Sequence, residues 1–188
     1  MRMFSFRPAL TMRGRKFKGL RGWAGKPLHP PLTDIPVGAY MLAAVFDLVS
    51  AVGAGEAWAR DFYRAASFTL IGGAVAGLGA AVTGFWDWLK STEKGTQARR
   101  TANAHATTMV LVTVLVLADI AVRVASFWDE QSTPGLPLAL TLAAAVLTTI
   151  GGTIGGGLVY DYGFNVETAG DHPVWHQSEQ DVFPYEKG

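Results

Sequence analysis

Two histidines and two aspartates lie at positions where they could jointly bind a cofactor or a metal ion. His29 and His105 each lie near the start of an apolar stretch, and Asp87 and Asp161 each lie near the end of one. Two neutral imidazoles that face each other across a helix bundle can ligate a haem, and a carboxylate on the second ring nitrogen then fixes the tautomer. The same nitrogens and carboxylates could instead hold a divalent metal such as zinc. In the structural alternative, His29 completes a turn and His105 caps its helix.

Three further charged residues, Asp47, Asp119 and Arg123, lie deeper in the apolar stretches. An ionised carboxylate at the centre of a bilayer costs on the order of 2.5–3.5 kcal/mol even on the lenient insertion scale, so these groups must be paired, protonated or turned inwards. Arg123 lies one helical turn after Asp119 and can pair with it. Because Asp47 has no such local partner, we expect Arg123 to bridge both carboxylates. One arginine and two aspartates form no continuous path across a bilayer, which favours a structural ion pair over a proton or cation relay.

The apolar stretches that carry these residues are long enough to cross a membrane as helices, which takes about 20 residues each. They cover residues 34–54, 65–89, 105–127 and 137–160. Pro36 suits the first turn of the first helix, with Thr33 or Asp34 as its cap. We therefore predict an all-α membrane protein whose four transmembrane helices form a bundle within residues 34–162. Residues 1–33 form a basic cytoplasmic arm and residues 163–188 a cytoplasmic tail.

The same polar landmarks recur in the two halves of the chain. Each half has a histidine at the start of a hairpin, an aspartate within it and an aspartate between two aromatic residues at its end. His29 and Asp87 are 58 residues apart, and His105 and Asp161 are 56 apart. This order predicts two repeated helical hairpins, related by an axis along the bilayer normal.

The basic residues predict the orientation of the chain. Thirteen of the 16 lysine and arginine residues lie in the N-terminal segment, the loop between the second and third stretches, or the tail. The positive-inside rule places these three segments, and so both termini, in the cytoplasm. A basic segment beside a membrane span is explained by anionic lipid headgroups, so we expect the lipid bilayer as a partner and no nucleic acid.

Composition narrows the function classes. The chain of 188 residues contains no cysteine, which excludes disulfides, thiolate metal sites and iron–sulfur ligation by this chain. It also lacks a nucleophile–base pair, a phosphate-binding glycine loop and a nucleotide fingerprint, so we do not expect a hydrolase or an NTPase that works on its own.

Three blocks of sequence resemble a known family. The blocks are Gly25–Gly38 with Phe46-Asp47-Leu48, Thr83–Trp88 with Arg99-Arg100 and His105, and Gly155–Tyr160 with Gly163 and Val166. Together they are similar to the predicted bacterial membrane proteins called domain of unknown function 2231, over about residues 25–166. Some relatives in that family are joined to a Rieske-type iron–sulfur domain after the fourth helix, and residues 173–188 look like the linker into such a domain. The resemblance implies that this chain lies in the plasma (inner) membrane of a bacterium and works beside a redox partner.

Our leading hypothesis is a membrane module associated with electron-transfer machinery, with a b-type haem between His29 and His105 near the cytoplasmic face. Its partners would be other membrane subunits of a redox complex, or a second copy of the chain. The alternative is an accessory subunit without a cofactor that packs against a larger membrane complex. A third possibility is a small proton or ion conductor through Asp47, Asp119 and Arg123.

Overall fold

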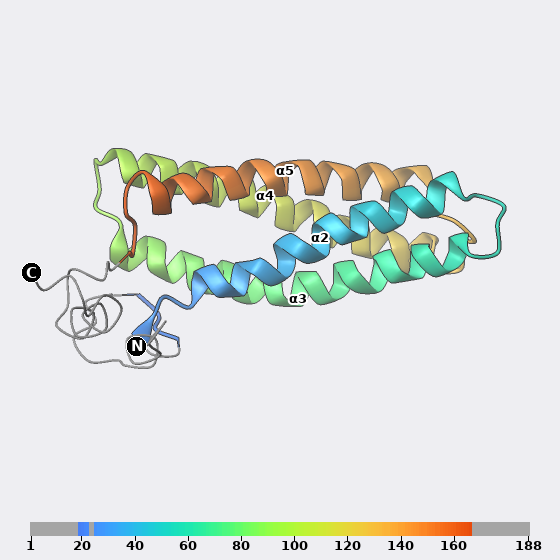
Figure 1. Ribbon diagram of the computed structural model, residues 1–188, viewed down its shortest axis with the longest axis horizontal. Helices are drawn as coiled ribbons and strands as arrows, with labels where there is room; N and C mark the ends of the chain where they lie inside the picture. Colours follow the sequence, from blue (N-terminus) through green and yellow to red (C-terminus); the bar gives the residue numbers. More distant parts are fainter. Residues whose placement is uncertain (1–18, 23–24, 167–188) are drawn as a thin grey trace, which may run out of the picture.

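The protein is an antiparallel bundle of four long helices (Figure 1). A computed structural model describes residues 19–22 and 25–166. The helices are α2 (His29–Val52), α3 (Ala59–Ser91), α4 (Gln97–Ser126) and α5 (Gly135–Tyr160). Each helix is long and apolar enough to span a membrane, and the described residues contain no β-strand. The predicted all-α fold of four membrane-spanning helices is confirmed, whereas the repetition of the hairpins remains a prediction. Most of the predicted N-terminal arm and of the tail lies outside the described residues.

The first helix begins earlier than the sequence pattern indicated. Helix α2 starts at His29, with Pro30 and Pro31 in its first turn, where a missing N–H breaks no intrahelical bond. Pro36, expected in the first turn, instead lies inside the helix. The helical segment therefore extends back to include His29 in the bundle.

Each helix packs against two neighbours. Helix α2 packs mainly on α3, and α4 packs mainly on α5, which makes two tight hairpins. Smaller contacts join α2 to α5 and α3 to α4. The helices consequently lie around the bundle in chain order, with α2 diagonal to α4 and α3 diagonal to α5.

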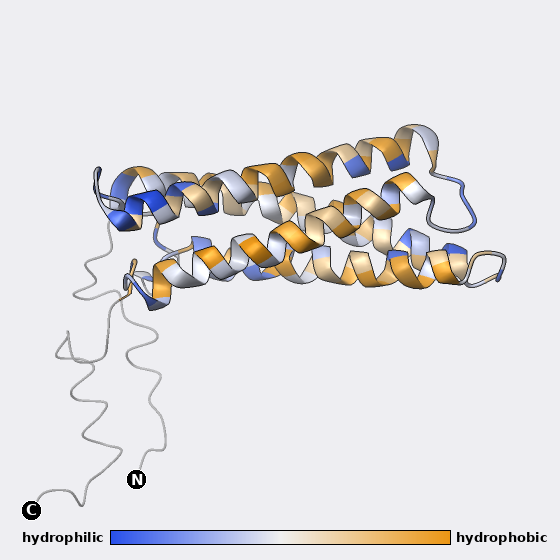
Figure 2. Cartoon of the chain, turned by 90° about the horizontal axis from the view of Figure 1, so that it is seen from above, coloured by the Kyte–Doolittle hydropathy of each residue, from blue (hydrophilic) through white to orange (hydrophobic). Residues whose placement is uncertain are grey.

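Small side chains lie inside the bundle and large apolar side chains lie outside, as is typical of helix bundles in membranes. Alanines such as Ala43, Ala66 and Ala144 are fully buried between the helices, while large apolar residues such as Val75 and Phe68 point outwards. Figure 2 shows hydrophobic residues along the length of the helices, with hydrophilic residues gathered toward the two ends of the bundle. Small residues inside let the helix backbones approach closely, and lipid covers the large residues outside.

Three layers follow one another along the axis of the bundle. His29 and His105 lie toward the end where α2 begins. A core of small and apolar residues fills the middle; it contains Tyr40, Ala43, Ala66, Leu70, Ala74, Val112, Val116 and Ala144. Asp47, Asp119 and Arg123 lie beyond it. His29 precedes Asp47 by 18 residues, which is about 27 Å of helix at 1.5 Å per residue.

Candidate functional site

The two histidines of the bundle face each other across its diagonal. His29 comes from the first turn of α2 and His105 from the third turn of α4. Their ring centroids are 6.4 Å apart, and the ring planes make an angle of 78°. Both side chains are half-buried. The fold therefore brings together two imidazoles that are separated by 76 residues in the sequence.

The hydrogen bonds of the two rings define their tautomers. His29 Nδ1 lies 2.8 Å from the carbonyl oxygen of Ala80 in α3, and His105 Nδ1 lies 2.8 Å from the carbonyl oxygen of Gly151 in α5. A carbonyl oxygen only accepts, so each Nδ1 carries the hydrogen and donates it. In the neutral ring, Nε2 then has a free lone pair. Neither Nε2 has a hydrogen-bond partner within the part of the chain that the structure describes.

A glycine makes room for each imidazole on the helix that accepts its hydrogen bond. A Cβ on Gly84 would lie 2.6 Å from His29 Cε1, and one on Gly155 would lie 2.9 Å from His105 Cε1. Each glycine follows the accepting carbonyl by four residues, one helical turn, so both hairpins use the same local arrangement. The backbone carbonyl and the glycine together hold each ring in place.

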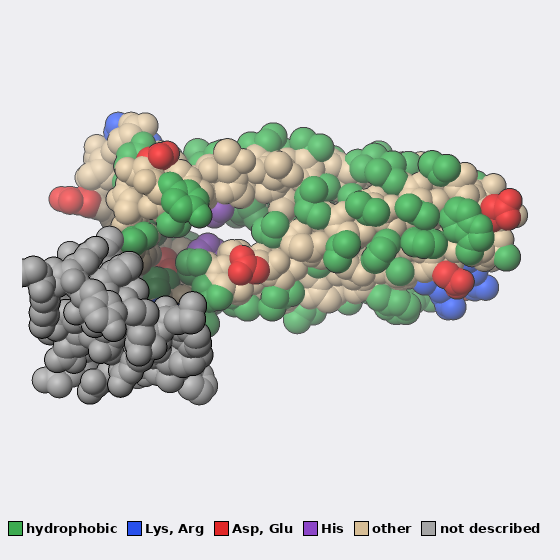
Figure 3. Space-filling view, viewed as in Figure 1, with side chains coloured by type: hydrophobic (Ala, Val, Ile, Leu, Met, Phe, Trp, Pro, Cys, Tyr) green, Lys and Arg blue, Asp and Glu red, His purple; other side chains and the backbone are tan. Residues whose placement is uncertain are grey.

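An opening separates the two hairpins at this end of the bundle. Figure 3 shows a gap through the molecule, with histidine side chains on its two sides; His29 and His105 are the two histidines in the described part of the chain. The bundle is thus hollow next to the imidazoles and closed in its middle, where the apolar core fills it.

The two aspartates that were predicted to accompany the histidines have other surroundings. Asp87 is buried, and its Oδ1 accepts a hydrogen bond from the backbone N–H of Leu20 at 3.2 Å. Asp161 follows the end of α5 and is exposed. Carbonyl oxygens, and neither carboxylate, accept the ring Nδ1 hydrogens. Within residues 19–22 and 25–166, no three side chains of His, Cys, Asp or Glu gather to hold a metal ion, so the structure gives no support to a four-ligand zinc site.

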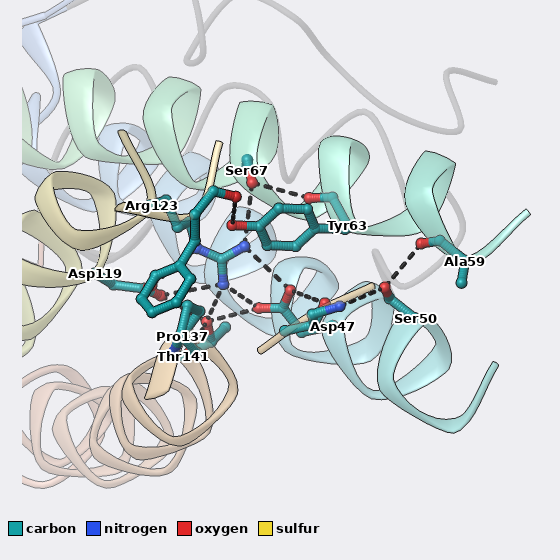
Figure 4. A network of polar contacts seen from close by, with 11 residues as sticks. Asp47, Ser50, Ala59, Tyr63, Ser67, Asp119, Arg123, Pro137 and Thr141 are labelled. Atoms are coloured by element: carbon teal, nitrogen blue, oxygen red, sulfur yellow. Dashed lines mark hydrogen bonds and ion pairs between the residues drawn. The ribbon is translucent and has the colours of Figure 1, made fainter. Parts of the chain in front are cut away.

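A second polar cluster lies in the other half of the bundle and is centred on Arg123 (Figure 4). Its guanidinium donates from Nε to Asp119 Oδ1 at 2.8 Å, and from its two terminal nitrogens to Asp47 at 2.5 and 3.2 Å. All three side chains are almost completely buried. Arg123 therefore joins the diagonal helices α2 and α4 through ion pairs with both aspartates.

Hydroxyl groups from the other helices complete this cluster. Ser67 of α3 accepts from Arg123 at 3.1 Å, and Thr133 in the loop before α5 donates to Asp47 at 2.9 Å. Thr141 of α5 lies between the two carboxylates. Arg123 also lies 5.1 Å from the ring centroid of Tyr63, whose hydroxyl donates to the carbonyl of Phe127. Each buried polar side-chain atom of the cluster has a partner atom within hydrogen-bonding distance, which suits a structural clamp.

Sequence reasoning did not identify the groups that support the two sites. Helices α3 and α5 contain many small residues, so the sequence does not distinguish the glycine beside each imidazole from the others. Gly155 does lie four residues after Gly151, a spacing that indicates close helix packing. Serine and threonine occur throughout these helices, and most of their hydroxyls donate to their own helix. Only the helix rotations in the structure separate Thr141, which contacts the ion cluster, from such residues.

Comparison with known proteins identifies the family to which the chain belongs. Residues 25–168 match the family described as predicted membrane protein (DUF2231). Comparisons with curated proteins and with solved structures gave no match. The matched segment contains the four helices, both histidines and the Arg123 cluster. The chain is a multi-pass membrane protein and belongs to the DUF2231 family of predicted membrane proteins.

Proposed function

We propose that this protein is a membrane electron-transfer module that holds one b-type haem between His29 and His105. The observation that carries the proposal is the pair of facing imidazoles whose Nδ1 hydrogens are donated to backbone carbonyls. This leaves the Nε2 of each ring as a ligand atom with its tautomer already set, as in metal sites where an acceptor hydrogen-bonded to the other ring nitrogen orients the histidine.

The distance between the rings suits one shared metal ion. An imidazole nitrogen binds a metal at about 2.0–2.1 Å, so two imidazoles that share one ion can have ring centres roughly 6 Å apart. The centroids of His29 and His105 are 6.4 Å apart. Two histidines are too few for a structural zinc site, which takes four protein ligands, but they are sufficient for a haem, whose four remaining iron ligands come from the porphyrin.

The surroundings also suit a flat group. The opening between the hairpins lies next to the histidines (Figure 3), and Gly84 and Gly155 let each imidazole lie close against the neighbouring helix at the side of this opening. When bound, the haem would supply one-electron transfer. The protein would supply two ligand nitrogens from His29 and His105, orient the rings through the carbonyls of Ala80 and Gly151, and close the inner side of the site with its apolar core.

We further propose that the haem lies toward the cytoplasm and exchanges electrons with another protein. The strong excess of lysine and arginine on the loop between α3 and α4 and on the N-terminal segment supports a cytoplasmic location of this end. The chain has no cysteine. Any cysteine-ligated iron–sulfur cluster that exchanges electrons with the haem must therefore belong to the partner protein.

The architecture favours electron transfer over conduction of protons or ions. The apolar core between the histidines and the Arg123 cluster contains Leu70, Val112 and Val116, which are completely or almost completely buried. An apolar layer of this kind disfavours a polar path along the bundle, because ions and protons need polar partners throughout.

The absorption spectrum of the full-length protein, purified from cells that are supplied with iron and a haem precursor, tests this proposal. We expect a Soret band, sharp α and β bands after reduction with dithionite, and one haem per chain in the pyridine haemochrome assay. A colourless preparation with native helix content would overturn the proposal.

Enlarging either glycine beside the imidazoles is expected to reduce haem binding. In Gly84→Ala and Gly155→Ala the added methyl group would lie within 3 Å of the ring, so the imidazole must move and its Nε2 is displaced with it. We expect haem content to fall by about tenfold in each variant, as when a supporting residue of a metal ligand is removed.

Gly72→Ala and Gly152→Ala are the matched controls, because a methyl group at either position meets nothing within 4 Å in the same two helices. They should keep their haem. Equal haem content in all four variants would show that these histidine positions do not hold the group.

A further inference from the structure

The hydroxyl of Thr141 has more acceptors around it than it has hydrogens. Its Oγ1 lies 2.6 Å from Asp119 Oδ2, 2.7 Å from Asp47 Oδ2 and 2.9 Å from the carbonyl oxygen of Pro137. All of these atoms are buried, and a hydroxyl has a single hydrogen to donate. With both carboxylates ionised, only one of the three short oxygen–oxygen contacts could contain a hydrogen.

A distance of 2.6 Å between two oxygens is typical of an O–H···O hydrogen bond, and in particular of one to a charged oxygen. Without a hydrogen between them, the lone pairs of the hydroxyl and of the carboxylate would repel each other in a medium of low dielectric constant. The contact between Thr141 and Asp119 therefore calls for one hydrogen more than the side chains supply when both aspartates are ionised.

The net charge of the cluster also indicates that it holds one additional proton. The cluster contains one guanidinium and two carboxylates, and within the described residues no second cation pairs with either aspartate. Fully ionised, it would leave a net charge of −1 among helices that face lipid. Such an isolated buried charge is avoided by taking up a proton.

The contacts of the two aspartates differ and indicate which one holds the proton. Asp47 receives both terminal nitrogens of Arg123, at 2.5 and 3.2 Å, together with the hydroxyl of Thr133. Asp119 receives Arg123 Nε on Oδ1, while its Oδ2 is 3.4 Å from the guanidinium and closest to Thr141. Asp47 is thus the better stabilised anion.

We propose that the cluster is a proton-binding site in which Asp119 is neutral and carries the proton on Oδ2. Asp119 Oδ2–H donates to Thr141 Oγ1, Thr141 donates to Asp47 Oδ2, and Asp47 remains ionised against Arg123. Every short contact between Thr141 and a carboxylate then contains a hydrogen, and the cluster as a whole is neutral.

Few other ionisable groups act on this site. Helix α3 contributes Tyr63, whose ring faces Arg123, and Ser67; α5 contributes Thr141, which does not ionise; and the loop after α4 contributes Glu130 near Tyr63. The proposal concerns Asp119 and is independent of whether the histidine site holds a haem.

Infrared spectroscopy of the full-length protein in lipid nanodiscs at neutral pH tests the proposal. We expect the carbonyl stretching band of a protonated carboxyl group, equivalent to one group per chain, at a pH where an exposed aspartic acid, with a pKa of about 3.9, is ionised. Incorporation of carboxyl-¹³C aspartate should shift this band in the wild-type protein, so the assignment to aspartic acid needs no variant. Absence of the band, or a band that the label leaves in place, would overturn the proposal.

Variants then assign the band to one residue. Asp119→Asn should remove it, and the asparagine N–H can still donate to Thr141, so the bundle should fold. Asp87→Asn is the matched control, because Asp87 is also a buried aspartate but lies outside the cluster. The band should persist in that variant. A band that survives Asp119→Asn and disappears in Asp87→Asn would overturn the proposal.

Discussion

Replacing Arg123 by leucine is expected to destabilise the bundle by about 3–5 kcal/mol, the usual cost of removing one partner of a buried ion pair. The arginine side chain is 1% exposed, and its guanidinium contacts Asp47, Asp119, Ser67 and Thr141. Without it, the ionised Asp47 remains in the interior of the bundle with hydroxyl groups as its only partners. The two diagonal helices also lose the side chain that joins them. Unfolding by SDS, followed by far-UV circular dichroism in mixed micelles, measures the change.

Arg64→Leu is the control for this variant. Arg64 lies on the exposed side of α3 near the same end of the bundle, and a surface substitution changes stability by less than about 0.5 kcal/mol. If Arg123→Leu were as stable as Arg64→Leu, the cluster could not be what fixes the rotation of α2 and α4.

Substituting the histidines has the largest expected effect on the proposed haem. His29→Ala and His105→Ala each remove one of the two proposed haem ligands, and we expect each to lower the haem content by more than about tenfold, the lower range for loss of a group that only supports a ligand. The double variant should contain no haem. The pyridine haemochrome assay measures haem per chain, and circular dichroism verifies that the four helices still form.

The remaining histidines provide the matched controls. His172 and His176 belong to the tail and lie outside the described residues, so His172→Ala and His176→Ala test whether histidine loss in general reduces haem. Both should retain the wild-type spectrum. Haem that is lost from these two variants and retained by His29→Ala and His105→Ala would assign the ligands to the tail.

The fold follows from the sequence because lipid imposes a simple requirement. An apolar segment of about 20 residues satisfies its backbone only as a helix, so four such segments specify four helices and an even number of crossings. An even number of crossings also places the first turn of α2 and the start of α4 at the same end. That is why His29 and His105 could be expected near each other before their rings were seen 6.4 Å apart.

The helix boundaries were less predictable from hydrophobicity. Pro30 and Pro31 read as a turn before the first span, but both fit the first turn of α2 because proline has no N–H to lose there. The extra residues place His29 on the helix and its ring against α3.

The partners of the candidate site depend on rotations that a single sequence does not specify. The acceptors of the ring hydrogens are the backbone carbonyls of Ala80 and Gly151. Every residue has a backbone carbonyl, so the residue type does not indicate which one accepts. The sequence predicts Asp87 and Asp161 beside the rings because a carboxylate is an acceptor that can be recognised from the residue type. The four-residue spacing of Asp119 and Arg123, by contrast, predicts an ion pair within one helix, and the structure has these groups 2.8 Å apart.

The electron paramagnetic resonance spectrum of the oxidised protein tests the central claim most directly, because it reports both axial ligands of a haem. Two imidazoles whose planes make an angle of 78° predict one low-spin ferric species with large g anisotropy, present once per chain. That signal should vanish in the double variant His29→Ala/His105→Ala. A high-spin haem signal in the wild-type protein, or a low-spin signal that survives loss of both histidines, would contradict the account.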